Sequence, residues 1–332
     1  MQIRLHISLL AFLTYSAMFG ALAQPKEIVN EENDRMILAY TFYLRQKMSL
    51  EFVSVKFPSL KEYVENTMNE WNREFIPAVK NIDSALTSNL NGEWLKNKDA
   101  LYEKNIRADY STISEEKAKE FIDVVNDRTY GRIQTPILET FLIWHPKYQN
   151  IPEKEFTDGY VNKFSTKEQR NPLQINLKII YPRSWKAIDG NKKTNVVQAF
   201  ISGYGLGNVS LTVSIDKAKS DYTNEKISQL LSKESLLKTL QPSDKALTYK
   251  SDFTVDNCKA AAISFYQEKT KSDKKTCSIN ETYSTYYKNY RISCIFVVSS
   301  LTSEDVNEKF KKYQNLFKRI VDNIVILSQW GQ

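Results

Sequence analysis

The sequence predicts an α+β protein: a helical N-terminal region followed by an antiparallel β-sheet sandwich covered by helices. Between about residues 30 and 130, apolar residues recur every three or four positions, which is the period of an amphipathic helix. From Gln174 onward they alternate with polar residues, which is the period of strands that bury one face. Helical periodicity returns at about 224–240 and 304–326, so helices are expected to cover the apolar surface of the sheet.

The first two helices are expected to form an antiparallel pair that turns at Phe57-Pro58. Their apolar stripes consist of Met36, Ile37, Tyr40, Tyr43 and Leu44, and then of Leu60, Tyr63, Val64, Met68, Trp71, Phe75, Val79, Ile82 and Leu86. Ser59 and Glu62 have capping-box spacing, so the second helix is predicted to begin at Ser59, and Pro77 is predicted to kink it. The aromatic residues are either a binding face or packing between helices, and we expect packing.

A third helix is expected to begin at Ser114 and to end near Gly131 and Pro136. Its apolar side consists of Ala118, Phe121, Ile122 and Val125. The charged stretch from Lys96 to Arg107 is expected to be a solvated connection, and a short helix is expected within 153–164.

Strands are expected wherever apolar and polar residues alternate in the second half. These segments are 175–179, 196–202, 209–215, 260–269, 277–287 and 290–300. Lys288-Asn289 is expected to form the tight turn between the last two strands. The closing helix is capped by Thr302 or Ser303 and carries Phe317 in mid-stripe. Trp185, just after the first strand, and Phe317 are both predicted to be buried in the sandwich.

The second half resembles the PsbP-like superfamily, over residues of about 150 to 327. The resemblance rests on a strand that runs into a Pro-x-x-Trp turn at Ile179 to Trp185, on the strands at 196–201, 209–215 and 290–299, and on the closing helix. It implies an α/β/α sandwich domain at 149–332. The helical domain expected at 24–148 has no counterpart in the small members of the superfamily. The superfamily includes photosystem subunits, a Ran-binding transport factor and exported bacterial proteins, so its fold implies no single function.

Residues 1–23 have the pattern of a secretory signal peptide. Arg4 precedes an apolar stretch, and Ala21-Leu22-Ala23 places small residues where signal peptidase reads them, so cleavage is expected before Gln24. The alternative is an uncleaved anchor, because the apolar part approaches the roughly 20 residues of a spanning helix. No later segment is apolar enough to span a membrane. We therefore expect a secreted or periplasmic protein without a membrane span after cleavage.

Composition is typical of a folded protein with a modest positive charge. The 332 residues are 42% hydrophobic and carry a net charge of +7, with lysines spread along the chain. This spread indicates an ordinary solvated surface, while the alternative is weak attraction to anionic envelopes. A nucleic-acid partner is not expected of an exported chain without a concentrated basic stripe.

Neither Cys277 nor Cys258 is expected to form a disulfide with Cys294. A turn at Lys288-Asn289 places Cys294 opposite Tyr283, six residues from Cys277 along that strand. The separation is about 20 Å, far beyond the Cα limit of about 7 Å. Cys258 is also badly placed for Cys294, at the start of the neighbouring strand.

No residue is assigned a catalytic, cofactor-binding or metal-binding role, and no cofactor is expected. His145, the single histidine after residue 23, stands before Pro146 at the end of an apolar run and is interpreted as an ordinary residue at an element end. The Gly-rich segment 203–207 is either an anion-binding nest or a hairpin connection, and we expect the connection. The acidic pairs Glu31-Glu32 and Glu115-Glu116 are expected at helix starts. Asn208 and Asn280 each begin a segment that matches a glycosylation sequon.

Three functions remain open from the sequence. The first is an exported, non-enzymatic accessory or binding protein that holds a protein or small-ligand partner. The second is an envelope hydrolase with an acid-based site between the two halves. The third is a structural or surface-interaction protein whose helix pair docks on a larger assembly.

Overall fold

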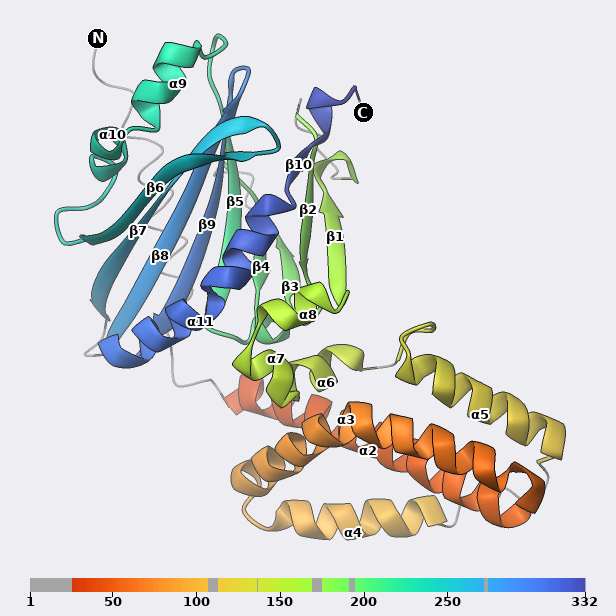
Figure 1. The fold of residues 1–332 in the computed structure, drawn as a ribbon. Coiled ribbons are helices and arrows are strands. Elements are labelled where there is room, and N and C mark those ends of the chain that lie inside the picture. The colour runs from red at the N-terminus through yellow and green to blue at the C-terminus, as the bar shows by residue number, and fades with distance from the viewer. Residues whose placement is uncertain are drawn as a thin grey trace. The chain divides into compact units, whose positions relative to one another are not determined.

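The computed structural model describes residues 26–106, 113–135, 137–168, 175–190, 195–271 and 274–331. The predicted signal peptide and its cleavage site lie outside these residues. The chain divides into a helical unit, Gln24–Asn150, and a sheet unit, Ile151–Gln332 (Figure 1). The predicted α+β class, with a helical N-terminal region before an antiparallel sheet, is confirmed.

The helical unit is built on the predicted antiparallel helix pair. Its helices are α2 (Lys26–Lys56), α3 (Lys61–Asn89), α4 (Glu93–Ile106), α5 (Glu115–Thr129), α6 (Leu138–Trp144) and α7 (Pro146–Asn150). The aromatic stripe packs between helices, as expected. The Trp71 ring lies 4.2 Å from that of Phe75, which lies 4.9 Å from Phe141 of α6.

The start of α3 differs from the capping-box prediction. Pro58–Leu60 forms a 3-10 turn, and α3 begins at Lys61 without a side-chain cap. The Ser59 hydroxyl instead donates to the carboxylate of Glu115. Pro77 lies inside α3 without ending it. At α5, the expected N-cap is confirmed, because Ser114 Oγ accepts a hydrogen bond from the Lys117 backbone N–H at 3.3 Å.

The segment predicted as a solvated connection, Lys96 to Arg107, is helical through Ile106, because α4 is anchored by a tryptophan just before it. Trp94 is fully buried, and its indole N–H donates to Asp83 Oδ1 at 2.7 Å. Lys98 Nζ binds the same carboxylate at 2.9 Å. One large apolar anchor and one ion pair thus hold a helix whose other positions are mostly charged.

The sheet unit contains two antiparallel sheets rather than the single sheet predicted. The strands are β1 (Val161–Ser165), β2 (Leu177–Pro182), β3 (Lys186–Asp189), β4 (Val196–Ile201), β5 (Val209–Lys217), β6 (Lys245–Val255), β7 (Cys258–Lys271), β8 (Lys274–Tyr287), β9 (Tyr290–Ser300) and β10 (Val325–Ile326). The larger sheet has the order β3-β4-β5-β9-β8-β7-β6, and the smaller has the order β1-β2-β10.

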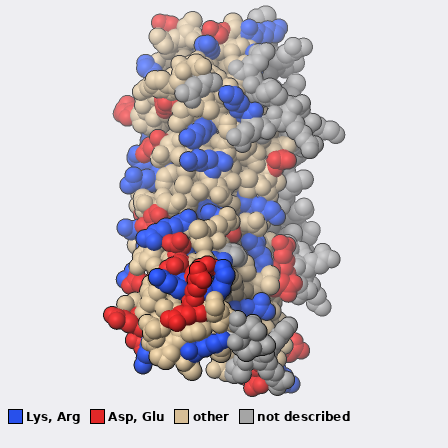
Figure 2. Space-filling view, turned by 90° about the vertical axis from the view of Figure 1, so that its right-hand side faces the viewer, with Lys and Arg blue, Asp and Glu red and all other residues tan. Residues whose placement is uncertain are grey.

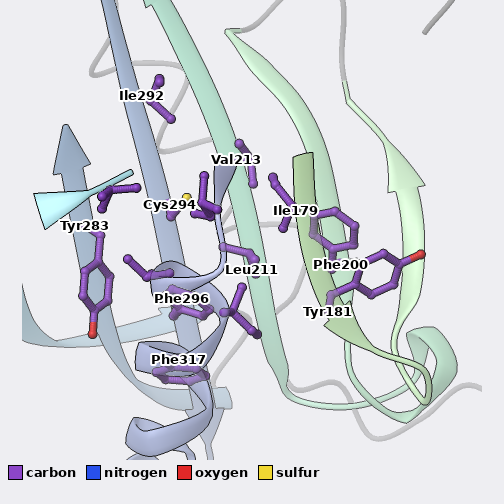
Figure 3. Close-up of a cluster of buried hydrophobic side chains, with 14 of the residues drawn as sticks. Ile179, Tyr181, Phe200, Leu211, Val213, Tyr283, Ile292, Cys294, Phe296 and Phe317 are labelled. Atoms are coloured by element: carbon purple, nitrogen blue, oxygen red, sulfur yellow. The ribbon is translucent and has the colours of Figure 1, made fainter. Parts of the chain in front are cut away.

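One face of the larger sheet, here the first face, carries the main core (Figure 3). Helix α11 (Ser303–Asp322) packs on it, with the Phe317 ring stacked 4.3 Å from Phe296. The smaller sheet joins the same core, where Tyr181 of β2 lies 4.3 Å from Phe200 of β4. The predicted burial of Trp185 and Phe317 is confirmed, at 3% and 0% exposure.

The opposite or second face of the larger sheet is covered in part by two short helices. The helix predicted at 224–240 is divided into α9 (Asn224–Leu230) and α10 (Lys233–Leu237). The break follows from Ser232, whose Oγ caps α10 by accepting from the Ser235 backbone N–H at 3.3 Å. The apolar cluster between these helices and the sheet consists of Leu231, Leu236, Ala261, Ile263 and Tyr286.

Several short or exposed elements were not predicted from the sequence. The helix expected within 153–164 is only α8 (Glu153–Thr157), and strand β1 follows it. Strand β6 forms one edge of the larger sheet and is mostly exposed, so it lacks the alternation of a half-buried strand. Two bulges in its pairing with β7, together with Lys245 and Lys250, are typical of a protected sheet edge.

Candidate functional site

His145 lies at the end of α6, as predicted, and has a local structural role there. Its Nδ1 accepts a hydrogen bond from the Lys147 backbone N–H at 3.1 Å, at the start of α7. Its ring lies 5.1 Å from that of Tyr148. The imidazole therefore helps to connect two helix ends.

The three cysteines are free thiols, and the predicted strand register is confirmed. Cys294 pairs with Tyr283, while Cys277 pairs with Ser300. Burial raises the pKa of the Cys294 thiol to about 12. Burial also raises the pKa of Cys258, and the charge of Asp256 adds to this effect. Thiols whose pKa is raised by burial pack like small apolar side chains and are poor nucleophiles.

The Gly-rich segment 203–207 connects β4 and β5, as expected. Gly207 is required by close approach, because a Cβ there would lie 2.1 Å from Ser202 Oγ. Of the sequons, Asn208 immediately precedes β5, while Asn280 lies within β8 and is 2% exposed. Glu115-Glu116 occupies the first turn of α5, as predicted, whereas Glu31-Glu32 lies inside α2 rather than at its start.

Two carboxylates of the sheet unit stabilise the chain itself. Glu155 of α8 is 5% exposed and accepts from the backbone N–H and the hydroxyl of Ser184, both at 2.7 Å. It thereby fixes the Pro-x-x-Trp turn. Asp256 Oδ2 accepts from the Ile326 backbone N–H at 2.7 Å and from Trp330 Nε1 at 3.2 Å. It thereby holds β10 and the C-terminal turn.

The second face of the larger sheet carries a line of small side chains across four strands. Ser214 of β5, Ser293 of β9, Ser284 of β8 and Ala261 of β7 are paired side by side in the sheet register. We call these four residues the serine row. Ser284 and Ser293 are 1% and 3% exposed, and neither hydroxyl makes a hydrogen bond with any described residue. Such a buried, unpartnered group costs about 1–3 kcal/mol of stability.

Arg291 lies next to the serine row, two residues before Ser293 on the same face of β9. Its Nε is buried and, within the described part of the chain, has no hydrogen-bond partner. In the sheet register it faces Asp216 of β5 and Tyr286 of β8. Burial raises the pKa of Tyr286, and the positive charge of Arg291 lowers it. Three unpartnered polar atoms thus lie within two adjacent rows of one sheet face.

The row on the other side of the serine row alternates between threonine and isoleucine. It contains Thr212 of β5, Ile295 of β9, Thr282 of β8 and Ile263 of β7. The two isoleucines are 9% and 2% exposed. The α9–α10 cluster packs over Ala261 and Ile263. The second face therefore carries polar and apolar side chains next to each other along these rows.

No local pattern in the sequence distinguishes the serine row from an ordinary polar strand face. The polar residues at alternate positions of β5, which are Ser210, Thr212 and Ser214, look like the solvent-facing half of an amphipathic strand. The signal that distinguishes the row is size: three serines and an alanine meet in one register row, and this meeting depends on strand pairing far apart in the sequence.

Charge is divided unequally between the two units. The sheet unit has 28 Lys and Arg against 19 Asp and Glu, a net charge of +9, while residues 24–150 have 17 against 20, a net charge of −3. Figure 2 shows basic and acidic side chains interspersed over the face it presents.

Across the described residues, no helix is long and apolar enough to cross a membrane, and no three His, Cys, Asp or Glu side chains gather as metal ligands.

No family model matches the chain, and no curated protein sequence is significantly similar to it. Among solved structures, the chain is similar to cyanobacterial PsbP from Synechocystis sp. PCC 6803, with 11% identity and a TM-score of 0.35, over 50% of this chain and 92% of that one. It is also similar to LpqN of Mycobacterium tuberculosis, involved in cell envelope biogenesis, with 10% identity and a TM-score of 0.34, over 53% and 96% of the two chains.

A third similar structure is that of a protein from Bacteroides thetaiotaomicron VPI-5482, with 15% identity and a TM-score of 0.27, over 45% of this chain and 44% of that one.

Proposed function

We propose that this protein is an exported, non-enzymatic binding protein that acts in the cell envelope or outside the cell and holds a small ligand on its sheet unit. The observation that supports this function is the group of unpartnered polar atoms at Ser284, Ser293 and Arg291. Buried polar groups are normally hydrogen-bonded, and the exceptions call for an explanation. A bound ligand supplies the missing partners.

Binding fits these serines better than catalysis does. A nucleophilic serine requires a hydrogen-bonded base, and that base is itself oriented by a third group. Neither Ser284 nor Ser293 has such a hydrogen bond with a described residue. The export part of the proposal is supported by the Ala21-Leu22-Ala23 pattern.

Native mass spectrometry of the mature protein, purified without detergent from its natural host, tests this function. We expect a fraction of the molecules to carry one additional small molecule, which organic extraction removes. The control is the same preparation after extraction, which should rebind the recovered compound at one per chain. A protein that carries no ligand but hydrolyses esters, glycosides or peptides would contradict the proposal in favour of the hydrolase.

A further inference from the structure

We propose that Asn91 is a modification site, at which the protein deamidates spontaneously and alters its own backbone without an enzyme. The site lies in the helical unit and is independent of the proposed binding function. Three observations support it: an exposed Asn-Gly pair, a backbone nitrogen without a hydrogen bond, and the place of the pair just before the residues that anchor α4.

The first observation is that the single Asn-Gly pair of the sequence lies in a short exposed turn. Asn91 and Gly92 connect α3, which ends at Asn89, to α4, which begins at Glu93. Both residues of the pair are exposed, and a Cβ added to Gly92 would have no heavy atom within 4 Å beyond its chain neighbours. Glycine has no side chain to hinder its backbone nitrogen. The Gly92 nitrogen can therefore reach the side-chain carbonyl carbon of Asn91.

The reaction joins these two atoms. The Gly92 nitrogen loses its proton to solvent base and attacks Cγ of Asn91, so that a C–N bond forms between them. The side-chain amide nitrogen takes up a proton and leaves as ammonia, and the product is a cyclic imide. Water then opens this ring at either of its carbonyl groups, which leaves aspartate or isoaspartate at position 91. Water is the only co-reactant, and no oxidation or reduction takes place. Asparagine is among the residues that are thermolabile in proteins.

The second observation is that the attacking nitrogen makes no hydrogen bond. Among the described residues, no group accepts from the Gly92 N–H. The sequence also has two Asp-Gly pairs, and in both of them the glycine N–H is engaged. Gly159 donates to the Phe156 carbonyl and Gly190 donates to the Val197 carbonyl, both at 3.2 Å. A hydrogen bond of this kind holds the proton on the nitrogen and fixes the backbone, so it protects these two pairs from ring closure.

The third observation is that the turn comes directly before the anchor of α4. Trp94 is fully buried and donates to Asp83 of α3 at 2.7 Å, and Lys98 binds the same carboxylate at 2.9 Å. Isoaspartate carries the main chain through the side-chain carbon, which lengthens the turn by one atom and displaces α4 from this anchor. Ordinary aspartate leaves the turn unchanged and adds a negative charge close to the N-terminus of α4, where the helix dipole favours it. Isoaspartate should therefore loosen α4, and aspartate should not.

Peptide mapping by mass spectrometry after storage of the folded mature protein at mildly alkaline pH tests the site. We expect the peptide that contains Asn91 to become one mass unit heavier and to divide into two chromatographic forms, aspartate and isoaspartate. The rate should rise with pH, because the attack requires the deprotonated nitrogen. Asn97 is the internal control: it is also exposed, but it lies inside α4, where helical hydrogen bonds hold the next N–H. It should gain mass far more slowly.

Variants separate the modification from its effect on α4. Asn91→Gln keeps an amide but moves its carbonyl carbon one bond further from the Gly92 nitrogen, so modification of this turn should be lost. Asn97→Gln is the matched control and should age at Asn91 as the wild type does. Limited trypsin digestion then measures the loosening of α4 through cleavage after Lys96. Aged wild type should be cleaved there faster than fresh wild type, whereas aged Asn91→Gln and fresh Asn91→Asp should be cleaved as fresh wild type is.

Two results would overturn the modification site. One is an Asn91 peptide that gains mass no faster than the Asn97 peptide in the folded protein. The other is a chain that carries Asn91→Gln and still gains mass in this turn as fast as the wild type. If Asn91 is modified as expected but cleavage after Lys96 does not change, the loosening of α4 is wrong.

Discussion

Single residues in the sheet unit have roles that depend on their sheet face. On the first face, Phe317 and Phe296 stack at 4.3 Å and join helix to sheet. On the second face, Ser293 lies in β9, the strand that also contains Phe296, and is buried as well. Its hydroxyl has no hydrogen-bond partner among the described residues. Burial of the two phenylalanine rings stabilises the fold, whereas burial of the unpartnered Ser293 hydroxyl costs free energy. A buried polar group without a partner is an exception in folded proteins and calls for an explanation.

Truncating Phe317 tests the packing of the first face. Phe317→Ala leaves a cavity between α11 and the sheet, so we expect the free energy of unfolding to fall by about 3–5 kcal/mol. Chemical denaturation followed by circular dichroism measures it. Lys318→Ala, at the exposed neighbouring position, is the control and removes only an i,i+4 ion pair with Asp322, worth about 0.5 kcal/mol. Equal losses in the two variants would contradict the packing described here.

At the scale of elements, the start of α11 is tied to the end of β9. Thr302 caps the helix by accepting from the Asp305 backbone N–H at 3.2 Å. Ser300 donates to the Asp305 carboxylate, and Lys309 pairs with it at 2.9 Å. These two interactions lower the pKa of Asp305 below its usual value of 3.8, and the hydrogen bond from Ser300 has the larger effect.

The lowered pKa predicts how the stability of α11 depends on pH. Because Asp305 is more acidic in the folded state, its contribution is fully present above about pH 5 and is lost as the pH falls through the folded-state pKa. The wild type should therefore melt above Asp305→Asn at pH 6, and the difference should shrink towards zero near about pH 2. Glu304→Gln, in the same helical turn, is the control. A difference that grows on acidification would contradict the assigned interactions.

The elements also show what the sequence does and does not specify. Strands and helices with one continuous apolar face, such as β5, β9 and α11, were predicted close to their observed bounds. Strand β6 was not predicted, because an edge strand exposed to solvent needs no alternation. Helix α4 was not predicted, because one tryptophan anchors it among charged residues. The serine row needed strand pairing, which no local pattern encodes.

At the scale of the whole molecule, two units with different composition share one chain. The net charge of +7 hides a sheet unit at +9 beside an N-terminal unit at −3. Lysines that look evenly spread along the sequence are therefore enriched in the unit that carries the serine row. An anion in solution is attracted to that unit over a distance of about one Debye length, 8–10 Å at physiological salt.

The proposed export of this chain rests on the pattern of its first 23 residues, and this pattern yields the last prediction. Signal peptidase reads small residues at the two positions now held by Ala21 and Ala23, so the mature protein should begin at Gln24. N-terminal sequencing of the exported protein measures this directly. Ala23→Trp should block processing and leave the chain with the membrane fraction, whereas Leu22→Phe, at the unread position between them, should be processed normally. A wild-type protein that still begins at Met1 and sediments with membranes would show that the segment is an anchor. In that case the serine row would work at a membrane surface rather than free in the periplasm or medium.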